Sequence, residues 1–105
     1  MQEQDAARQA AIAAYEVERK QLMRIFAANF KELRQQLGLS QEELADKTNL
    51  HRTNIGSYEQ ADHEPTLSTM LILADAFDVS LDRLAEGMPV PKERRPRRNL
   101  KKTRS

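Results

Sequence analysis

Large apolar residues recur about every 3.6 positions through the first third of the chain, which is the period of an amphipathic α-helix. No Gly or Pro interrupts residues 4–37, and Ala, Glu, Gln, Arg, Lys and Leu dominate this stretch. These residue types are strong helix formers, so the pattern predicts helix throughout. The expected inward positions are Tyr15, Leu22, Met23, Phe26, Phe30, Leu33 and Leu37.

Residues 1–24 form an extension that cannot bury much apolar surface alone. Residues 6–14 are mostly alanine, and Ile12 is their only large apolar side chain. Such a helix requires a partner surface. It either folds back on the helix that follows or pairs with a second chain, and we favour pairing in a homodimer.

Cap signals divide the next fifty residues into short helices. Gly38 ends the long helix, and Ser40 with Glu43 has the capping-box form, which starts a helix at Gln41 that ends near Thr48. Three further helices are expected to begin at polar residues, namely at His51, at Pro65-Thr66 and at Ser80. The helix that begins at Ser80 is expected to end at Gly87.

Composition limits the chain to one small domain with polar extensions. It has 105 residues and no Cys, which excludes a disulfide framework, a thiolate metal site and a Cys nucleophile, and favours a cytoplasmic protein. The longest apolar run, residues 70–74, is far too short to cross a membrane. His51 and His63 lack metal-ligand spacing, and no Gly-rich phosphate loop occurs. We therefore expect no cofactor, no metal and no enzymatic activity.

Charge is distributed unevenly along the chain. Residues 88–105 hold eight basic residues and one acidic residue, so the tail carries +7 and the remainder −6 within a total of +1. Three prolines in the tail, Pro89, Pro91 and Pro96, lie among these charges. Such a segment cannot build a core, so we expect it to be disordered on its own.

Residues 41–60 have the features of a helix-turn-helix. Ala45 is the small residue where two helices cross, and Asn49 tolerates the left-handed conformation of a tight turn. Leu44, Leu50, Ile55 and Tyr58 lock the second helix onto the first. Residues 26–87, from LRQQLGLSQEELADKTNLHRTNIGSYEQ through EPTLSTMLILADAFDVSLDRLAEG, resemble the XRE family of phage Cro and repressor proteins.

The resemblance implies an all-α, five-helix lambda repressor-like domain at residues 25–87. The N-terminal helical extension, residues 1–24, precedes it, and the disordered basic tail, residues 88–105, follows it. The family fold places its third helix in the major groove of double-stranded DNA, usually as a homodimer on a palindromic operator. The expected function is a sequence-specific transcription regulator, a repressor or autoregulator, located in the cytoplasm and on the nucleoid when bound to DNA.

Helical geometry selects the residues that face DNA. With Ile55 and Tyr58 inward, a 100° step puts Thr53 and Ser57 on the opposite face, with Arg52 and Asn54 on its flanks. An arginine pairs well with guanine O6 and N7, a threonine methyl meets a thymine methyl, and a serine hydroxyl donates or accepts. The DNA-binding candidates are Gln41, Arg52, Thr53, Asn54 and Ser57, where Gln41 matches the family position that holds a phosphate.

Two further features bear on this prediction. Arg34 and Glu59 match family positions that form a structural ion pair. The loop after the recognition helix, residues 60–64, carries two carboxylates where the family usually has Gly and basic residues, and carboxylates repel phosphates. The tail supplies the missing positive charge through Arg94, Arg95, Arg97, Arg98, Lys101 and Lys102.

The acidic body also favours a second hypothesis. A protein-interaction module of the antitoxin or adaptor type keeps the helix-turn-helix fold, binds DNA weakly or through its tail, and holds a protein partner through the N-terminal helix. Arg52, Thr53 and Ser57 in the readout positions favour the regulator.

Overall fold

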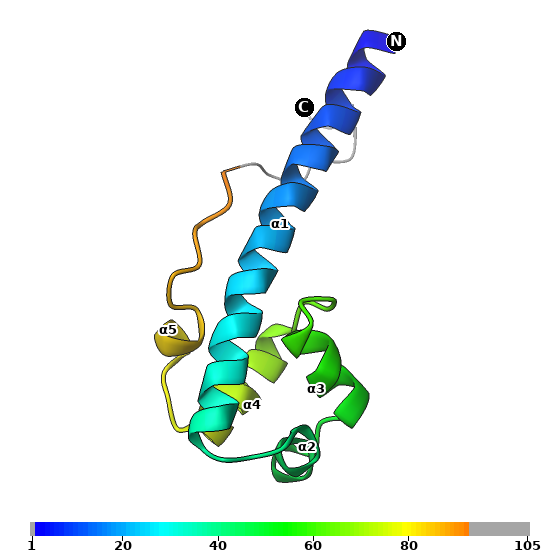
Figure 1. The fold of residues 1–105 in the computed structure, drawn as a ribbon. Coiled ribbons are helices and arrows are strands. Elements are labelled where there is room, and N and C mark those ends of the chain that lie inside the picture. The colour runs from blue at the N-terminus through cyan, green and yellow to red at the C-terminus, as the bar shows by residue number, and fades with distance from the viewer. Residues whose placement is uncertain (1, 93–105) are drawn as a thin grey trace, which may run out of the picture.

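The computed structural model describes residues 2–92, with side chains from Gln4 onward, and this part contains five helices and no strand. The helices are α1 (Gln2–Gln36), α2 (Gln41–Thr48), α3 (Arg52–Glu59), α4 (Leu67–Phe77) and α5 (Leu81–Leu84). Four short helices gather around the C-terminal half of α1, while its N-terminal half projects beyond them (Figure 1). The all-α prediction is confirmed, and residues 93–105, which include the basic residues proposed for DNA contact, lie outside the described part.

The N-terminal extension and the first helix of the domain are one element. α1 runs for 35 residues without a break, so the predicted boundary between residues 24 and 25 lies inside a helix. At 1.5 Å per residue such a helix is about 52 Å long, which accounts for the 54 Å long axis of the described structure. A continuous helix cannot fold back on itself, and the fold-back alternative for the extension is therefore wrong.

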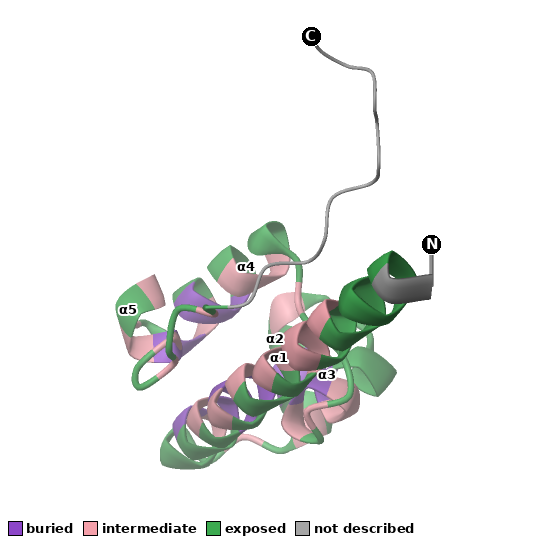
Figure 2. Ribbon diagram, turned by 90° about the horizontal axis from the view of Figure 1, so that it is seen from above, coloured by how far each residue is buried: buried purple, intermediate pink, exposed green. Residues whose placement is uncertain are grey.

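The core forms where the inner faces of α1, α3 and α4 meet, and Phe30 is its centre. Its side chain is fully buried. The ring lies 5.5 Å from that of Phe77 in an edge-on arrangement, 5.9 Å from Phe26 and 6.2 Å from Tyr58. Offset and edge-on aromatic pairs stabilise beyond simple burial of area. Figure 2 shows the buried residues on the inward sides of α1 and α4. The other buried members are Met23, Leu33, Leu44, Ala45, Ile55, Leu73, Ala74 and Leu84.

Two details of the predicted helices are wrong. α5 ends at Leu84 rather than at Gly87, because the Asn29 side-chain amide donates to the carbonyls of Leu84 and Glu86, at 2.9 Å each, and so fixes a turn there. Leu37 is 47% exposed although the periodicity placed it inward. It follows the last residue of α1, although its backbone N–H still donates to the Leu33 carbonyl at 3.2 Å.

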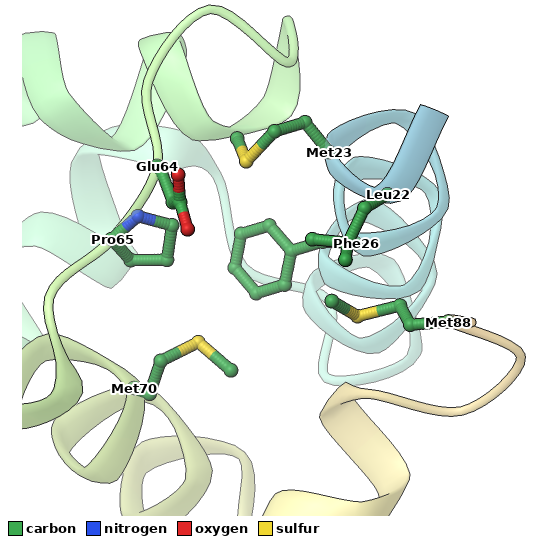
Figure 3. Close-up of a pocket in the computed structure, with 7 residues that line it drawn as sticks. All are labelled: Leu22, Met23, Phe26, Glu64, Pro65, Met70 and Met88. Atoms are coloured by element: carbon green, nitrogen blue, oxygen red, sulfur yellow. The ribbon is translucent and has the colours of Figure 1, made fainter. Parts of the chain in front are cut away.

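The first residues of the predicted tail pack against the domain. Met88 lies against the core and lines an apolar pocket of about 140 Å³ with Met23, Phe26 and Met70. Figure 3 shows the Phe26 ring pointing toward Pro65 between the side chains of Met23 and Met70. Thioethers adapt to irregular gaps, so the chain after α5 is held on the domain by a flexible apolar contact.

Among the described residues, no helix combines the length and hydropathy that a bilayer span requires.

Within residues 2–92, three residues other than Gly adopt left-handed backbone conformations, and they end helices or shape loops. Asn49 and Asp78 have φ values of 60° and 58° as C-caps of α2 and α4. Asn and Asp tolerate this region because their short polar side chains bond locally. Ala61, in the loop after α3, has φ of 60° without that benefit. Its Cβ therefore strains the loop.

Replacing Ala61 with Gly is expected to stabilise the protein by about 0.5–1 kcal/mol, because the relief of the left-handed strain exceeds the added backbone entropy. Urea unfolding followed by circular dichroism measures the change. Ala85→Gly is the control: Ala85 has φ of −96°, so this variant is expected to lose about 0.4–1 kcal/mol. Equal destabilisation by both variants would contradict the backbone strain proposed at Ala61.

Candidate nucleic-acid interface

A capping box fixes the start of α2. The Ser40 hydroxyl accepts from the Glu43 backbone N–H at 3.0 Å, and the Ser40 backbone N–H donates to Glu43 Oε1 at 2.8 Å. These bonds satisfy N–H groups that have no partner within the helix. Gln41 consequently occupies the first position of α2, where the helix N-terminus adds partial positive charge.

The turn between α2 and α3 is held by local side-chain bonds. Asn49 supplies the left-handed residue, and the Leu50 backbone N–H donates to Thr48 Oγ1 at 3.2 Å. His51 is the N-cap of α3, and its Nδ1 accepts from the Thr53 backbone N–H at 3.2 Å. The turn therefore sets the angle at which α3 leaves α2.

α3 has one buried face and one exposed face. Ile55 is completely buried and Tyr58 is 4% exposed. Both residues therefore face inward, as their helical spacing in the sequence predicts. Arg52, Thr53 and Asn54 are exposed, and Ser57 is half-buried. Figure 1 shows α3 on the outside of the bundle beside α2. The structure thus gathers the predicted readout residues on one accessible helix.

Arg34, Glu59 and Gln41 form a polar network that joins three helices. Arg34 makes a two-point contact with the Glu59 carboxylate, through Nε to Oε2 and through Nη2 to Oε1 at 3.1 Å. The Gln41 amide donates to the same Oε1 at 3.1 Å. Arg34 Nη1 also donates to the Leu39 carbonyl at 2.6 Å.

The two charged side chains of this network are nearly enclosed. Arg34 is 13% exposed and Glu59 is 6% exposed. Their bonds connect the C-terminal end of α1, the N-terminal end of α2 and the C-terminal end of α3. Gln41 is braced on Glu59 rather than on the readout residues of α3. The network therefore holds the C-terminal end of α3 in a fixed position against α1 and α2.

The acidic loop after α3 contacts the N-terminal extension through a residue that sequence reasoning missed. Arg19 Nη1 lies 3.6 Å from Glu64 Oε1, and its Nε donates to Glu16 at 3.1 Å. The hydrogen bond to Glu16, together with the charges of Glu16 and Glu64, raises the pKa of Arg19. No sequence signal pairs Arg19 with Glu64, because the partners are far apart along the chain. Part of the negative charge of the loop is thus neutralised within the domain.

Comparison with known proteins decides the family. The model of the helix-turn-helix family HTH_3 matches residues 30–84, just over half of the chain. The chain belongs to the helix-turn-helix family. The matched region begins at Phe30 and ends at Leu84, so the first 29 residues lie outside it.

Helix-turn-helix relatives agree with this assignment. Control protein C.SmaI of Serratia marcescens is 47% identical over 60 residues, covering 57% of this chain and 71% of that protein. The solved structure of the restriction-modification controller protein C.AhdI from Aeromonas hydrophila is 35% identical, with a TM-score of 0.57, and the match covers 59% of this chain and 94% of that one.

A third comparison shows the fold alone. The structure of an HTH_3 family transcriptional regulator from Vibrio cholerae has a TM-score of 0.60 at 24% identity, and the match covers 63% of this chain and 37% of that one. The XRE-type resemblance is confirmed. Helix-turn-helix regulators bind DNA and are not enzymes, so the predicted class, a DNA-binding transcription regulator without catalytic activity, is confirmed as well.

Glu59→Ala is expected to destabilise the protein by about 3 kcal/mol, because it leaves the enclosed Arg34 guanidinium without a carboxylate. Urea unfolding followed by circular dichroism measures this loss. Glu32→Ala is the matched control: Glu32 is 57% exposed and pairs with Arg83 at 3.1 Å, so its removal is expected to cost less than about 1 kcal/mol. Similar losses in the two variants would contradict the role assigned to the network.

Proposed function

We propose that this protein is a sequence-specific regulator that binds double-stranded DNA as a homodimer on a palindromic operator, and represses transcription from its own or a neighbouring promoter. One observation carries the proposal: Arg52, Thr53 and Asn54 are exposed together at the start of α3. The N-terminal part of a recognition helix makes most of the base contacts. The proposed site of action is the nucleoid, within the cytoplasm.

The proposed contacts divide into readout and positioning. Arg52 reads a guanine, while Thr53, Asn54 and Ser57 contact neighbouring base edges or sugars. Gln41, half-buried at the first position of α2, binds a phosphate with the help of the helix N-terminus. The six basic tail residues proposed for backbone contact, Arg94, Arg95, Arg97, Arg98, Lys101 and Lys102, add affinity without adding sequence preference.

The names of two relatives suggest which genes are regulated. C.SmaI is a control protein and C.AhdI is a restriction-modification controller protein. We propose the same kind of role for this chain, in which the regulator sets the expression of a restriction-modification gene pair. A bound operator upstream of such genes would give that role its direct support.

Arg52→Ala is expected to lower the preference for the operator over a scrambled duplex by about 1–3 kcal/mol, which corresponds to about 5-fold to 160-fold, because the bidentate contact to guanine is lost. Fluorescence anisotropy with duplex DNA from upstream of the gene measures both affinities. The melting temperature should not change, since Arg52 is exposed.

Arg83→Ala is the control for this experiment. Arg83 lies on α5, on the other side of α1 from α3 (Figure 1), and pairs with Glu32. Its removal is expected to leave the preference intact. If the unaltered protein shows no preference for any upstream duplex, the regulator hypothesis fails and the interaction-module hypothesis gains support.

The exposed face of α4 supports the homodimer. Leu67 and Leu71 lie one helical turn apart and are 71% and 53% exposed. We interpret these neighbouring exposed leucines as part of an apolar interaction surface. A twofold axis at α4, which belongs to the domain itself, would hold the two α3 helices at a fixed spacing on a palindrome. Pairing through the extension, which the sequence favoured and where Val17 is 67% exposed, is the alternative, and the extension also remains the predicted surface for a protein partner.

Combined replacement of Leu67 and Leu71 by Ser is expected to convert the dimer to a monomer at micromolar concentration, since it removes two exposed leucines from one face of α4. Sedimentation equilibrium measures the mass. Val17→Ser serves as the matched control and is expected to remain dimeric. Dissociation of the Val17 variant alone would place the interface on the extension.

A further inference from the structure

An open cleft of about 350 Å³ lies at the C-terminal end of α3, between α1 and the acidic loop. α1 contributes Arg19, Lys20 and Arg24, and the loop contributes residues 60–62. In Figure 1 the loop after α3 approaches the middle of α1, about halfway along the helix. The cleft therefore joins the end of the recognition helix to a part of α1 that lies outside the family match.

The charges around this cleft are not equivalent. Arg19 is engaged by Glu16 and Glu64, at 3.1 and 3.6 Å. Lys20 and Arg24 are both exposed, and among the described residues no carboxylate lies within ion-pair distance of either. Asp62 is the only carboxylate among the residues that line the cleft. The cleft thus presents two available cations against one anion, in a body whose net charge is negative.

Lys20 and Arg24 share one side of α1. They are four residues apart, so their side chains differ by about 40° around the helix axis. Lys31, also exposed, follows seven residues later and lies within about 20° of Arg24 in rotation. The basic side of α1 therefore continues from the cleft toward Arg34, which is bonded to the last residue of α3.

A recognition helix in the major groove has phosphate backbones on both flanks, because the groove is only about 12 Å wide. The loop that follows α3 supplies no Lys or Arg for the nearer backbone: residues 60–64 are Gln, Ala, Asp, His and Glu. A regulator without cations at this position loses much of its electrostatic affinity. Lys20 and Arg24 are the cations that the fold places beside the loop.

We propose that Lys20 and Arg24 bind the DNA phosphates that flank the C-terminal end of α3, so that the N-terminal extension replaces the loop as the backbone clamp on this side. This inference rests on the proposed function. The Arg19 contact with Glu64 supports the clamp, because it neutralises a loop carboxylate that would face the same phosphates. Asp62 remains as a repulsive group that limits affinity.

The test is salt-dependent DNA binding by the full chain carrying both Lys20→Gln and Arg24→Gln. Each phosphate contact contributes about 0.9 to the slope of log affinity against log salt concentration, so the slope is expected to become shallower by about two. Affinity for the operator and for a scrambled duplex should fall by the same factor, because phosphates carry no sequence information. Asp62→Asn should raise both affinities.

A matched pair, Arg83→Gln with Lys92→Gln, removes the same charge away from α3. Arg83 lies on α5, and Lys92 lies beside Glu18 and Gln21 on α1. This variant is expected to keep the slope of the unaltered protein. Equal changes in the two double variants, or no change in the Lys20 and Arg24 variant, would overturn the clamp while leaving the operator preference, and with it the proposed function, intact. Absence of any operator preference in the unaltered protein would overturn both.

Discussion

The packing of Phe30 against aromatic rings from α3 and α4 is the interaction on which the rest of the structure depends. Tyr58 reaches Phe30 from α3, and Phe77 reaches it from α4. A domain of this size has room for only one core, so the face of α3 that carries Tyr58 must turn inward. The face that carries Arg52 is then exposed by necessity. Burial on one side of an eight-residue helix thus produces the surface proposed to read DNA.

Polar contacts further constrain the helix positions that core packing determines. Glu59 accepts bonds from Arg34 and Gln41, so the ends of three helices converge on one carboxylate that is almost fully enclosed. Such a contact is costly to break, because a buried charge would remain unpaired. It therefore limits the relative movement of α2 and α3. The outer face of a helix-turn-helix held in this way is already ordered before binding. It therefore loses less conformational entropy when it binds.

Local signals in the sequence were sufficient for most element boundaries. The capping box at Ser40 and the N-caps at Thr66 and Ser80 bond to backbone groups three residues away, so short-range chemistry determines them. Predictions were wrong where distant residues intervene. α5 stops after one turn because Asn29, 55 residues earlier, bonds to the carbonyl of Leu84.

The sequence by itself determined the helix class, the turn at Asn49 and the phase of α3, because each depends on residues within a few positions of one another. It also carried the family pattern that joins these features. Only the tertiary structure decided what lies beside the end of α3. Arg19, Lys20 and Arg24 precede the acidic loop by about forty residues, and their position there follows from the packing of α1 across α3. Long-range proximity arises from burial of the shared core, so spacing along the chain does not encode it.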